Sequence, residues 1–315
     1  MRFLISSNIK SNRALYTTVV LFLLSSVLFW FLSWLFYHYK FGLTYDAMFT
    51  YFFTDKEFPE KLPLSQLLED IHIQLFIHLT YLLVVVSLFL HKHTRERFRI
   101  ALVLIAFLSA LGDTLLSLGV YFLSAFLIYV KILSFLLFQL SVGVMLFLSL
   151  KLFLSNEKEE TPGRGLLYSI VFVFVSATVL FTLLNFFLFI SKMGFSPLSV
   201  AQYYAGNPQE FVRPKSLEGM LTVMVPHTIA MVIYLFTLIH FAFFTNIKRK
   251  TLLSSITLLL ALLDNFSGLM IRFGDSGFAY VKLLSFSGLS FLMLYLSVAV
   301  GVSILRHRAK SVIVL

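Results

Sequence analysis

Four ionisable residues recur at one spacing inside apolar segments of the chain. Asp113 precedes Lys131 by 18 residues, and Asp264 precedes Lys282 by the same 18 residues. Each lysine lies in nearly the same heptapeptide, YVKILSF in the first half and YVKLLSF in the second. Charges inside a membrane helix are costly, so we expect each Asp to pair with its Lys and to face the bundle interior. Such a pair is either an acid-base site for proton transfer or a structural ion pair inherited by duplication.

Three histidines offer a second kind of chemistry. A helix rises 1.5 Å per residue, which places His72 and His227 about 10 Å from the outer membrane surface, level with the Asp–Lys pairs. Imidazole is a usual ligand of b-type haem, so His72 and His227 are the candidate ligands of one haem iron. His240 follows His227 by 13 residues, a rise of about 20 Å, and is the candidate ligand of a second haem. This spacing partly resembles di-haem cytochrome b, but the first half has Ser87 in place of His240.

The remaining five histidines have simpler expected roles. His38, His91, His93 and His307 lie among Lys, Arg or Tyr residues near the ends of apolar segments, so we expect them to be solvated or to face lipid headgroups. His78 lies inside an apolar segment, and we expect it to make a hydrogen bond between packed helices.

The composition requires membrane helices to hold all of these residues. The chain is 59% hydrophobic and 13% charged, with a mean hydropathy of +0.91, which is typical of polytopic membrane proteins. It has no Cys, which excludes disulfides, thiolate metal sites and covalently attached c-type haem. The net charge of +10 is carried by short basic clusters between apolar segments, where it sets topology rather than binding nucleic acid. We predict a multi-pass protein of the cell inner (cytoplasmic) membrane.

The apolar segments predict eight helices in two repeats. The expected spans of the first repeat are 14–37, 66–90 and a hairpin over 100–154 that turns near 119–125; those of the second are 165–190, 218–244 and a hairpin over 251–305. This gives domains 1–154 and 165–315, joined by a cytoplasmic linker at 155–164, with both termini cytoplasmic. Because four crossings is an even number, the repeats have the same orientation in the membrane. The first helices of the two repeats match only in hydrophobicity.

An aromatic segment separates the first and second spans of each repeat. Residues 196–208 contain an amphipathic run followed by a turn signal, and residues 44–53 are the similarly aromatic counterpart. We expect short helices on the outer membrane surface. They either cover the buried polar layer, dock an external protein, or contribute to the interfacial aromatic belt.

Parts of each half resemble a known kind of membrane protein. The resemblance lies in residues 67–76 and 211–221, at the second helix of each half, and in the hairpin that runs from each Asp to its YVK sequence. They resemble small, functionally uncharacterised four-helix bacterial integral membrane proteins, so the chain looks like a fused pair of them. The resemblance implies His at two alternate positions of the second helix. Here each half keeps one of them, His72 or His227, which favours a single shared, asymmetric site.

Our leading hypothesis is a haem b-binding, quinone-linked electron-transfer subunit of a respiratory-type complex. Lys131 and Lys282 would pair with haem propionates, Asp113 and Asp264 would take protons from a quinol, and an extracytoplasmic cytochrome or another membrane subunit would be the partner. Two alternatives stay open: an ion or small-solute transporter or channel with a buried Asp–Lys and His site, and a ligand-free membrane scaffold or assembly subunit. Hydrolase motifs such as HExxH do not occur in the sequence. Enzymatic activity, as part of an oxidoreductase complex, is left open.

Overall fold

The computed structural model describes residues 9–55, 57–160, 164–243, 245 and 247–313, with the backbone alone for 164–167 and 307–313. Residues 161–163 of the predicted linker and residues 1–8 of the predicted cytoplasmic N-terminus therefore lie outside the described residues. The side chain of His307 lies outside them as well.

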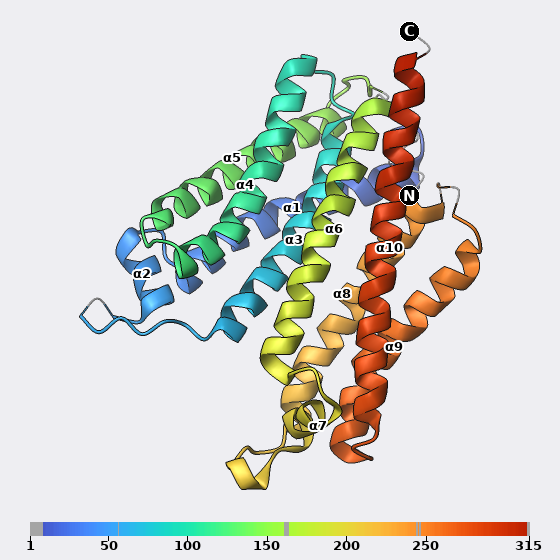
Figure 1. The fold of residues 1–315 in the computed structure, drawn as a ribbon. Helices are drawn as coiled ribbons and strands as arrows, with labels where there is room; N and C mark the ends of the chain where they lie inside the picture. The colour runs from blue at the N-terminus through green and yellow to red at the C-terminus, as the bar shows by residue number, and fades with distance from the viewer. Residues whose placement is uncertain (1–8, 56, 161–163, 244, 246, 314–315) are drawn as a thin grey trace. The chain divides into compact units, whose positions relative to one another are not determined.

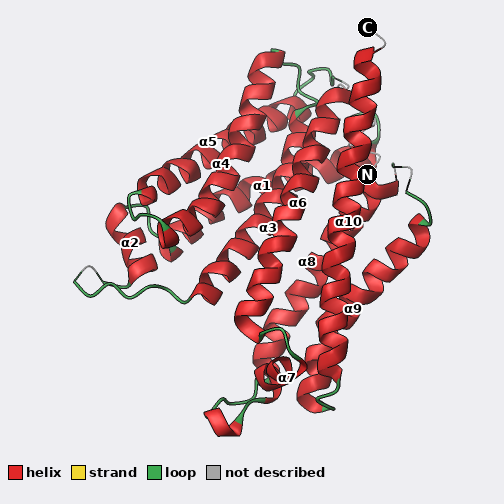
Figure 2. Cartoon of the chain, viewed as in Figure 1, coloured by secondary structure: helices red, strands yellow, loops and turns green. Residues whose placement is uncertain are grey.

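All regular structure in the described part of the chain is helical, and no strand occurs there (Figure 2). The α-helices are α1 (Arg13–Lys40), α2 (Tyr45–Phe53), α3 (Leu64–Phe89), α4 (Glu96–Phe122), α5 (Leu127–Leu154), α6 (Arg164–Met193), α7 (Pro197–Ala205), α8 (Leu217–Phe243), α9 (Lys250–Phe273) and α10 (Phe278–Ile313), with one 3-10 turn, η2 (Pro208–Glu210). Eight of these helices are long and apolar enough to cross a membrane. The predicted all-α membrane class and its eight spans are confirmed.

The chain divides into two compact units, Met1–Leu167 and Tyr168–Leu315. The first holds α1 to α5 and the second holds α6 to α10 (Figure 1). In each unit the second helix in order is short, and the other four are candidate spans. The order of elements is therefore the same in both units, as expected for a tandem repeat.

The last two helices of each unit form a tight hairpin. The first hairpin turns between Phe122 and Leu127, where the amides of Leu123 and Ser124 both donate to the carbonyl of Gly119, at 2.9 and 3.2 Å. The second turns between Phe273 and Phe278. Both turns lie midway between an Asp and its Lys, so each pair of charged side chains is level on neighbouring antiparallel helices.

The two short helices begin with the same backbone device. Gly42 and Gly194, at φ +78° and +69°, precede the N-cap residues Thr44 and Ser196. This left-handed conformation favours glycine. A Cβ on Gly42 would lie 2.3 Å from the Cβ of Ala47. The chain therefore reverses direction after each first span in the same way, and the predicted surface helices follow as α2 and α7.

The first helices of the units share more than hydrophobicity. Tyr37 of α1 stacks on Phe135 of α5, with ring centroids 3.5 Å apart. Phe189 of α6 stacks on Phe286 of α10 at 3.9 Å. Phe189 follows Tyr37 by 152 residues, and Phe286 follows Phe135 by 151. The structural repeat thus includes an aromatic contact of α1 and α6 that the sequence comparison missed.

Candidate functional site

The α4–α5 ion pair joins Asp113 and Lys131 in the interior of the first unit. Both residues are at most 1% exposed, and the Lys131 Nζ lies 2.8 Å from the Asp113 Oδ1. The same Nζ donates to the backbone carbonyl of Asp113 at 2.5 Å. The hydroxyl of Tyr37 donates to Oδ1 at 3.0 Å. The carboxylate is therefore paired with one ammonium group and one phenol inside the protein.

The α9–α10 ion pair repeats the close approach of the first pair, but the Asp264 Oδ1 meets the geometry of no hydrogen bond within the described structure. The Lys282 Nζ lies 2.8 Å from the Asp264 Oδ1 and donates to the backbone carbonyl of Asp264 at 2.8 Å. Both residues are 7% exposed. The predicted pairing and inward orientation of both Asp–Lys pairs are confirmed, and neither lysine extends to the membrane surface.

A phenol accompanies each ion pair, but it comes from a different element in each unit. Phe189 occupies the position of Tyr37 in the second unit, and it has no hydroxyl. Tyr204 of α7 is the phenol beside this pair, where it interacts electrostatically with Lys282 and Asp264, and its own counterpart in the first unit is Phe52. Burial raises the pKa of Tyr204, so its phenol stays neutral. Gly268 makes room for this ring, because a Cβ there would lie 2.7 Å from Tyr204 Cε1.

Next to each ion pair, a hydrogen bond ties the second span to the third. Thr114 and Asn265 directly follow the two aspartates. Thr114 Oγ1 lies 3.1 Å from the Nδ1 of His78 on α3, and Asn265 donates to the hydroxyl of Thr228 on α8. The predicted helix-packing role of His78 is confirmed.

The structure does not gather the predicted haem ligands within one unit. His72 lies half-buried on α3 of the first unit, whereas His227 and His240 lie on α8 of the second. His227 interacts electrostatically with the α9–α10 ion pair. His240 is 13 residues further along the same helix, about 20 Å away, and cannot share an iron with His227. Across the described residues, no three His, Asp or Glu side chains are grouped to hold a metal ion.

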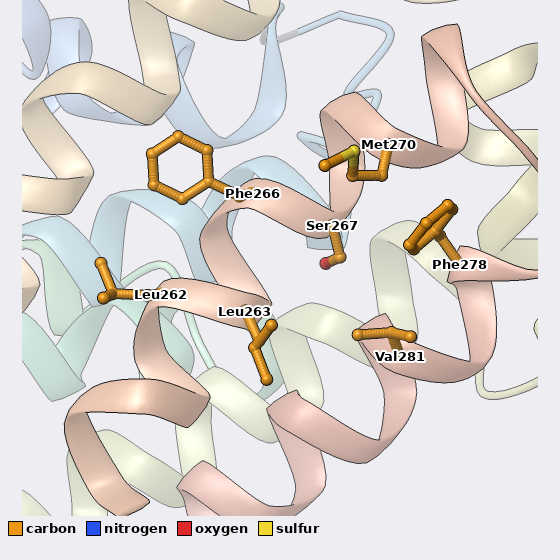
Figure 3. Close-up of a pocket in the computed structure, with 7 residues that line it drawn as sticks. All are labelled: Leu262, Leu263, Phe266, Ser267, Met270, Phe278 and Val281. Carbon is orange, nitrogen blue, oxygen red and sulfur yellow. The ribbon is translucent and has the colours of Figure 1, made fainter. Parts of the chain in front are cut away.

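Two pockets on the membrane helices are apolar. One of about 190 Å³ lies between α9 and α10 and has Ser267 as its one polar lining residue (Figure 3). The hydroxyl of Ser267 donates to the carbonyl of Asp264 at 2.9 Å, so it is already engaged. The other, of about 280 Å³, lies between α1 and α3 and is lined by Phe22, Phe29, Ile77, Thr80, Tyr81 and Val84. Sites for polar ligands are usually larger and carry several convergent polar groups. Neither pocket has the lining of a polar-substrate site, and no His of the described residues lines either of them.

Sequence reasoning missed a second polar cluster in the first unit. Asp70 of α3, 8% exposed, forms an ion pair with Lys40 at the end of α1 and accepts a hydrogen bond from the hydroxyl of Tyr51 on α2. Burial, followed by this hydrogen bond, raises the pKa of Tyr51. Asp70 resembles an ordinary residue of a helix end, and its counterpart is Val223, so no repeat pointed to it.

The segment after α3 is also more buried than its sequence indicates. The expectation that His91 is solvated or faces headgroups is wrong, because its side chain is fully buried. The Glu159 Oε2 lies 3.9 Å from its Nδ1, and the Glu159 carboxylate accepts hydrogen bonds from the amides of Ile9 and Lys10 at 2.8 and 2.5 Å. Burial lowers the pKa of His91, against the opposing charge of Glu159. The acidic residues before position 161 therefore bind the basic segment.

Comparison with known proteins yields one family. The family model described as a transmembrane helical domain matches residues 42–160 and again residues 194–311. The two matches begin at the paired glycines 42 and 194, so neither includes any residue of α1 or α6. No curated protein and no solved structure matches the chain. The protein is therefore a multi-pass membrane protein that carries this domain twice.

Proposed function

This chain belongs to the transmembrane helical domain family, and on that premise we propose that it is a ligand-free membrane scaffold or assembly subunit. The observation that carries the proposal is the closure of both ion pairs. Each lysine lies within ion-pair distance of the carboxylate and donates to the backbone carbonyl of its aspartate, and in the first unit the Tyr37 phenol adds a hydrogen bond to the carboxylate. Groups bound to one another in this way hold a hairpin together and are poorly placed to bind a substrate.

The outer surface of the first span supports a role in assembly. In its most apolar window, α1 has only 17% of its residues buried. Its exposed side chains include the large apolar ones of Leu21, Leu28 and Phe31. Such a helix packs against lipid or against a helix of another membrane subunit.

The test replaces both partners of each pair, using D113N/K131M and D264N/K282M. Exchanging a whole buried pair for neutral groups is often tolerated, whereas removing one partner costs about 3–5 kcal/mol. We expect both paired variants, and their combination, to match the wild type in folded amount, in growth complementation of a deletion strain, and in the membrane proteins that co-purify with the tagged chain. K131M alone is the control and should lower the folded amount.

Two outcomes would overturn the scaffold proposal. One is a paired variant that folds to wild-type levels but loses complementation, because that result assigns chemistry to the charged groups. The other is a wild-type preparation with which no membrane protein reproducibly co-purifies.

Electron transfer through haem b, linked to a quinone, is the second candidate. It is favoured by the half-buried His227, which interacts with the α9–α10 ion pair, and by the half-buried His72 of the other unit. A haem between His72 and His227 would require the two units to bring these side chains together. In that case H72A and H227A should each abolish quinol oxidation by an extracytoplasmic cytochrome in isolated membranes, whereas the scaffold proposal predicts no change in that rate.

A further inference from the structure

Each unit displays one nearly uncovered phenylalanine at the same place in the repeat. Phe58 is 82% exposed and Phe211 is 94% exposed. Each lies six residues before the first residue of the following span, Leu64 or Leu217. Both follow the short helix of their unit, α2 or α7. A solvent-facing Phe at equivalent positions of two diverged repeats points to a shared surface role.

The loop that carries Phe211 is held in shape. The amides and carbonyls of Asn207 and Val212 exchange two hydrogen bonds, at 2.9 and 3.0 Å, which close the loop. Phe211 itself has φ +57°, a left-handed conformation that is rare for residues other than glycine and that is found preferentially at functional sites. Figure 1 shows the segment after α7 extending beyond the helices of its unit.

Further contacts anchor this loop to the rest of the second unit. The amide of Lys215 donates to the carbonyl of Tyr204 on α7 at 3.0 Å, and the Arg272 Nε of α9 donates to the carbonyl of Lys215 at 2.9 Å. The Lys215 ammonium lies 4.6 Å from the centre of the Tyr203 ring. The exposure of Phe211 is thus fixed by the surrounding structure.

The loop before α3 is anchored in a related way. The amides of Glu60 and Leu62 donate to the carbonyls of Phe53 and Phe52, at 3.1 and 2.9 Å. The Lys61 Nζ donates to the carbonyl of Tyr121 near the end of α4 at 2.9 Å. Both loops are therefore tied to the short helix and to the third span of their unit.

We propose that Phe58 and Phe211 are interfacial anchors that insert into the boundary between headgroups and acyl chains of the bilayer. Each loop leads directly into a membrane span, so the bilayer is the surface already next to it. Phe is among the apolar side chains that interfacial segments bury at the boundary between headgroups and acyl chains. The bilayer is accordingly the occupant to which the geometry points.

The two loops differ in net charge, so they should respond differently to anionic lipid. Glu210, Arg213 and Lys215 lie around Phe211 in the sequence and leave one net positive charge, whereas Asp55, Lys56, Glu57, Glu60 and Lys61 lie around Phe58 and leave one net negative charge. Basic residues near a membrane surface are attracted to anionic lipids. Insertion of the second loop should therefore depend on anionic lipid, and insertion of the first should not.

The absence of Cys from the chain allows a clean test. Single-cysteine variants F58C and F211C, and the neighbouring exposed controls E57C and E210C, are labelled with a nitroxide and reconstituted in phosphatidylcholine vesicles with or without phosphatidylglycerol. The accessibility of the label to oxygen and to a water-soluble nickel chelate reports its depth. All four positions are exposed, so helicity measured by circular dichroism should match the wild type.

We expect the labels at positions 58 and 211 to be more accessible to oxygen and less accessible to nickel than those at 57 and 210. Phosphatidylglycerol should deepen the label at 211 alone, and R213Q/K215Q should remove that effect. Nickel accessibility at 58 and 211 equal to that of the controls would overturn the proposal and would leave a protein partner as the occupant of these loops. An equal response of both loops to phosphatidylglycerol would overturn the assignment of the anionic-lipid contact to Arg213 and Lys215.

Discussion

Tyr37 and Tyr204 supply the same chemical group to equivalent ion pairs from elements that are not equivalent. In one unit the phenol comes from the first span and donates a hydrogen bond to the carboxylate, and in the other it comes from the short helix and interacts electrostatically with the ion pair. The Asp–Lys pairing itself was predictable, because an 18-residue spacing about a turn places two side chains level. The choice of phenol was not, because it depends on which ring reaches the interior, and the many Tyr and Phe residues of the apolar segments do not show this in the sequence.

We expect removal of the Tyr37 hydroxyl to lower the free energy of unfolding more than removal of a tyrosine hydroxyl that donates to a neutral group. Y37F deletes a hydrogen bond to a buried carboxylate, which contributes about 1.5–3 kcal/mol. The control Y81F deletes a hydrogen bond from Tyr81 to the backbone carbonyl of Ser26, a neutral acceptor with a contribution of about 1 kcal/mol. The free energy of unfolding in mixed micelles measures both.

In the second unit the phenol can be moved rather than deleted. Y204F should destabilise the protein, and the added substitution F189Y, which places a phenol at the position used in the first unit, should recover part of the loss. If Y37F and Y204F unfold like the wild type, the phenols are not part of the ion-pair clusters.

At the scale of elements, the hairpins, the short surface helices and the spans follow from the sequence, because apolar length and Gly and Pro signals determine them locally. The docking of residues 155–160 on the segment after α3 does not. Lys92 forms an ion pair with Glu157, and Arg99 contacts Glu160 at 3.0 Å. A charged linker is expected to be exposed to solvent. The contacts of its carboxylates with the basic residues, and the burial of His91, therefore become visible only in the structure.

This docked segment should respond to pH through His91. Burial lowers the pKa of His91 in the folded state, so the unfolded state binds the proton more readily. The stabilisation is complete above the ordinary pKa of about 6.5 and is lost as the pH falls below it. The charged groups around His91 and Glu159 are those of Lys10, Lys92, His93, Arg99, Lys151, Glu157 and Glu160.

The ring nitrogens of His91 make no hydrogen bond within the described structure, so H91F should be tolerated. We expect the wild-type melting temperature to fall from about pH 7.5 to about pH 5.5, and H91F to show a smaller fall. H93F, at a side chain that is 86% exposed, is the matched control and should behave like the wild type. A pH dependence that H91F leaves unchanged would show that other groups cause it.

At the scale of the whole molecule, the chain is one membrane domain used twice. The repeat keeps the ion pair, the hairpin, the glycine turn and the exposed Phe, and it varies the phenol, the Asp70 cluster and the histidines. The features kept in both copies are those that stabilise the fold and those that we propose contact the bilayer. The histidines, on which the haem hypothesis rests, belong to the variable set, and this is why the scaffold proposal takes precedence.

The visible spectrum of the purified protein tests this account most directly. The protein is extracted in mild detergent, and its reduced-minus-oxidised spectrum is recorded together with those of H72A and H227A. The scaffold account predicts that a well-folded preparation, purified from haem-sufficient cells, lacks the sharp bands of a b-type haem. Bands that appear in the wild type and vanish in either His variant would contradict it and would establish the electron-transfer candidate in its place.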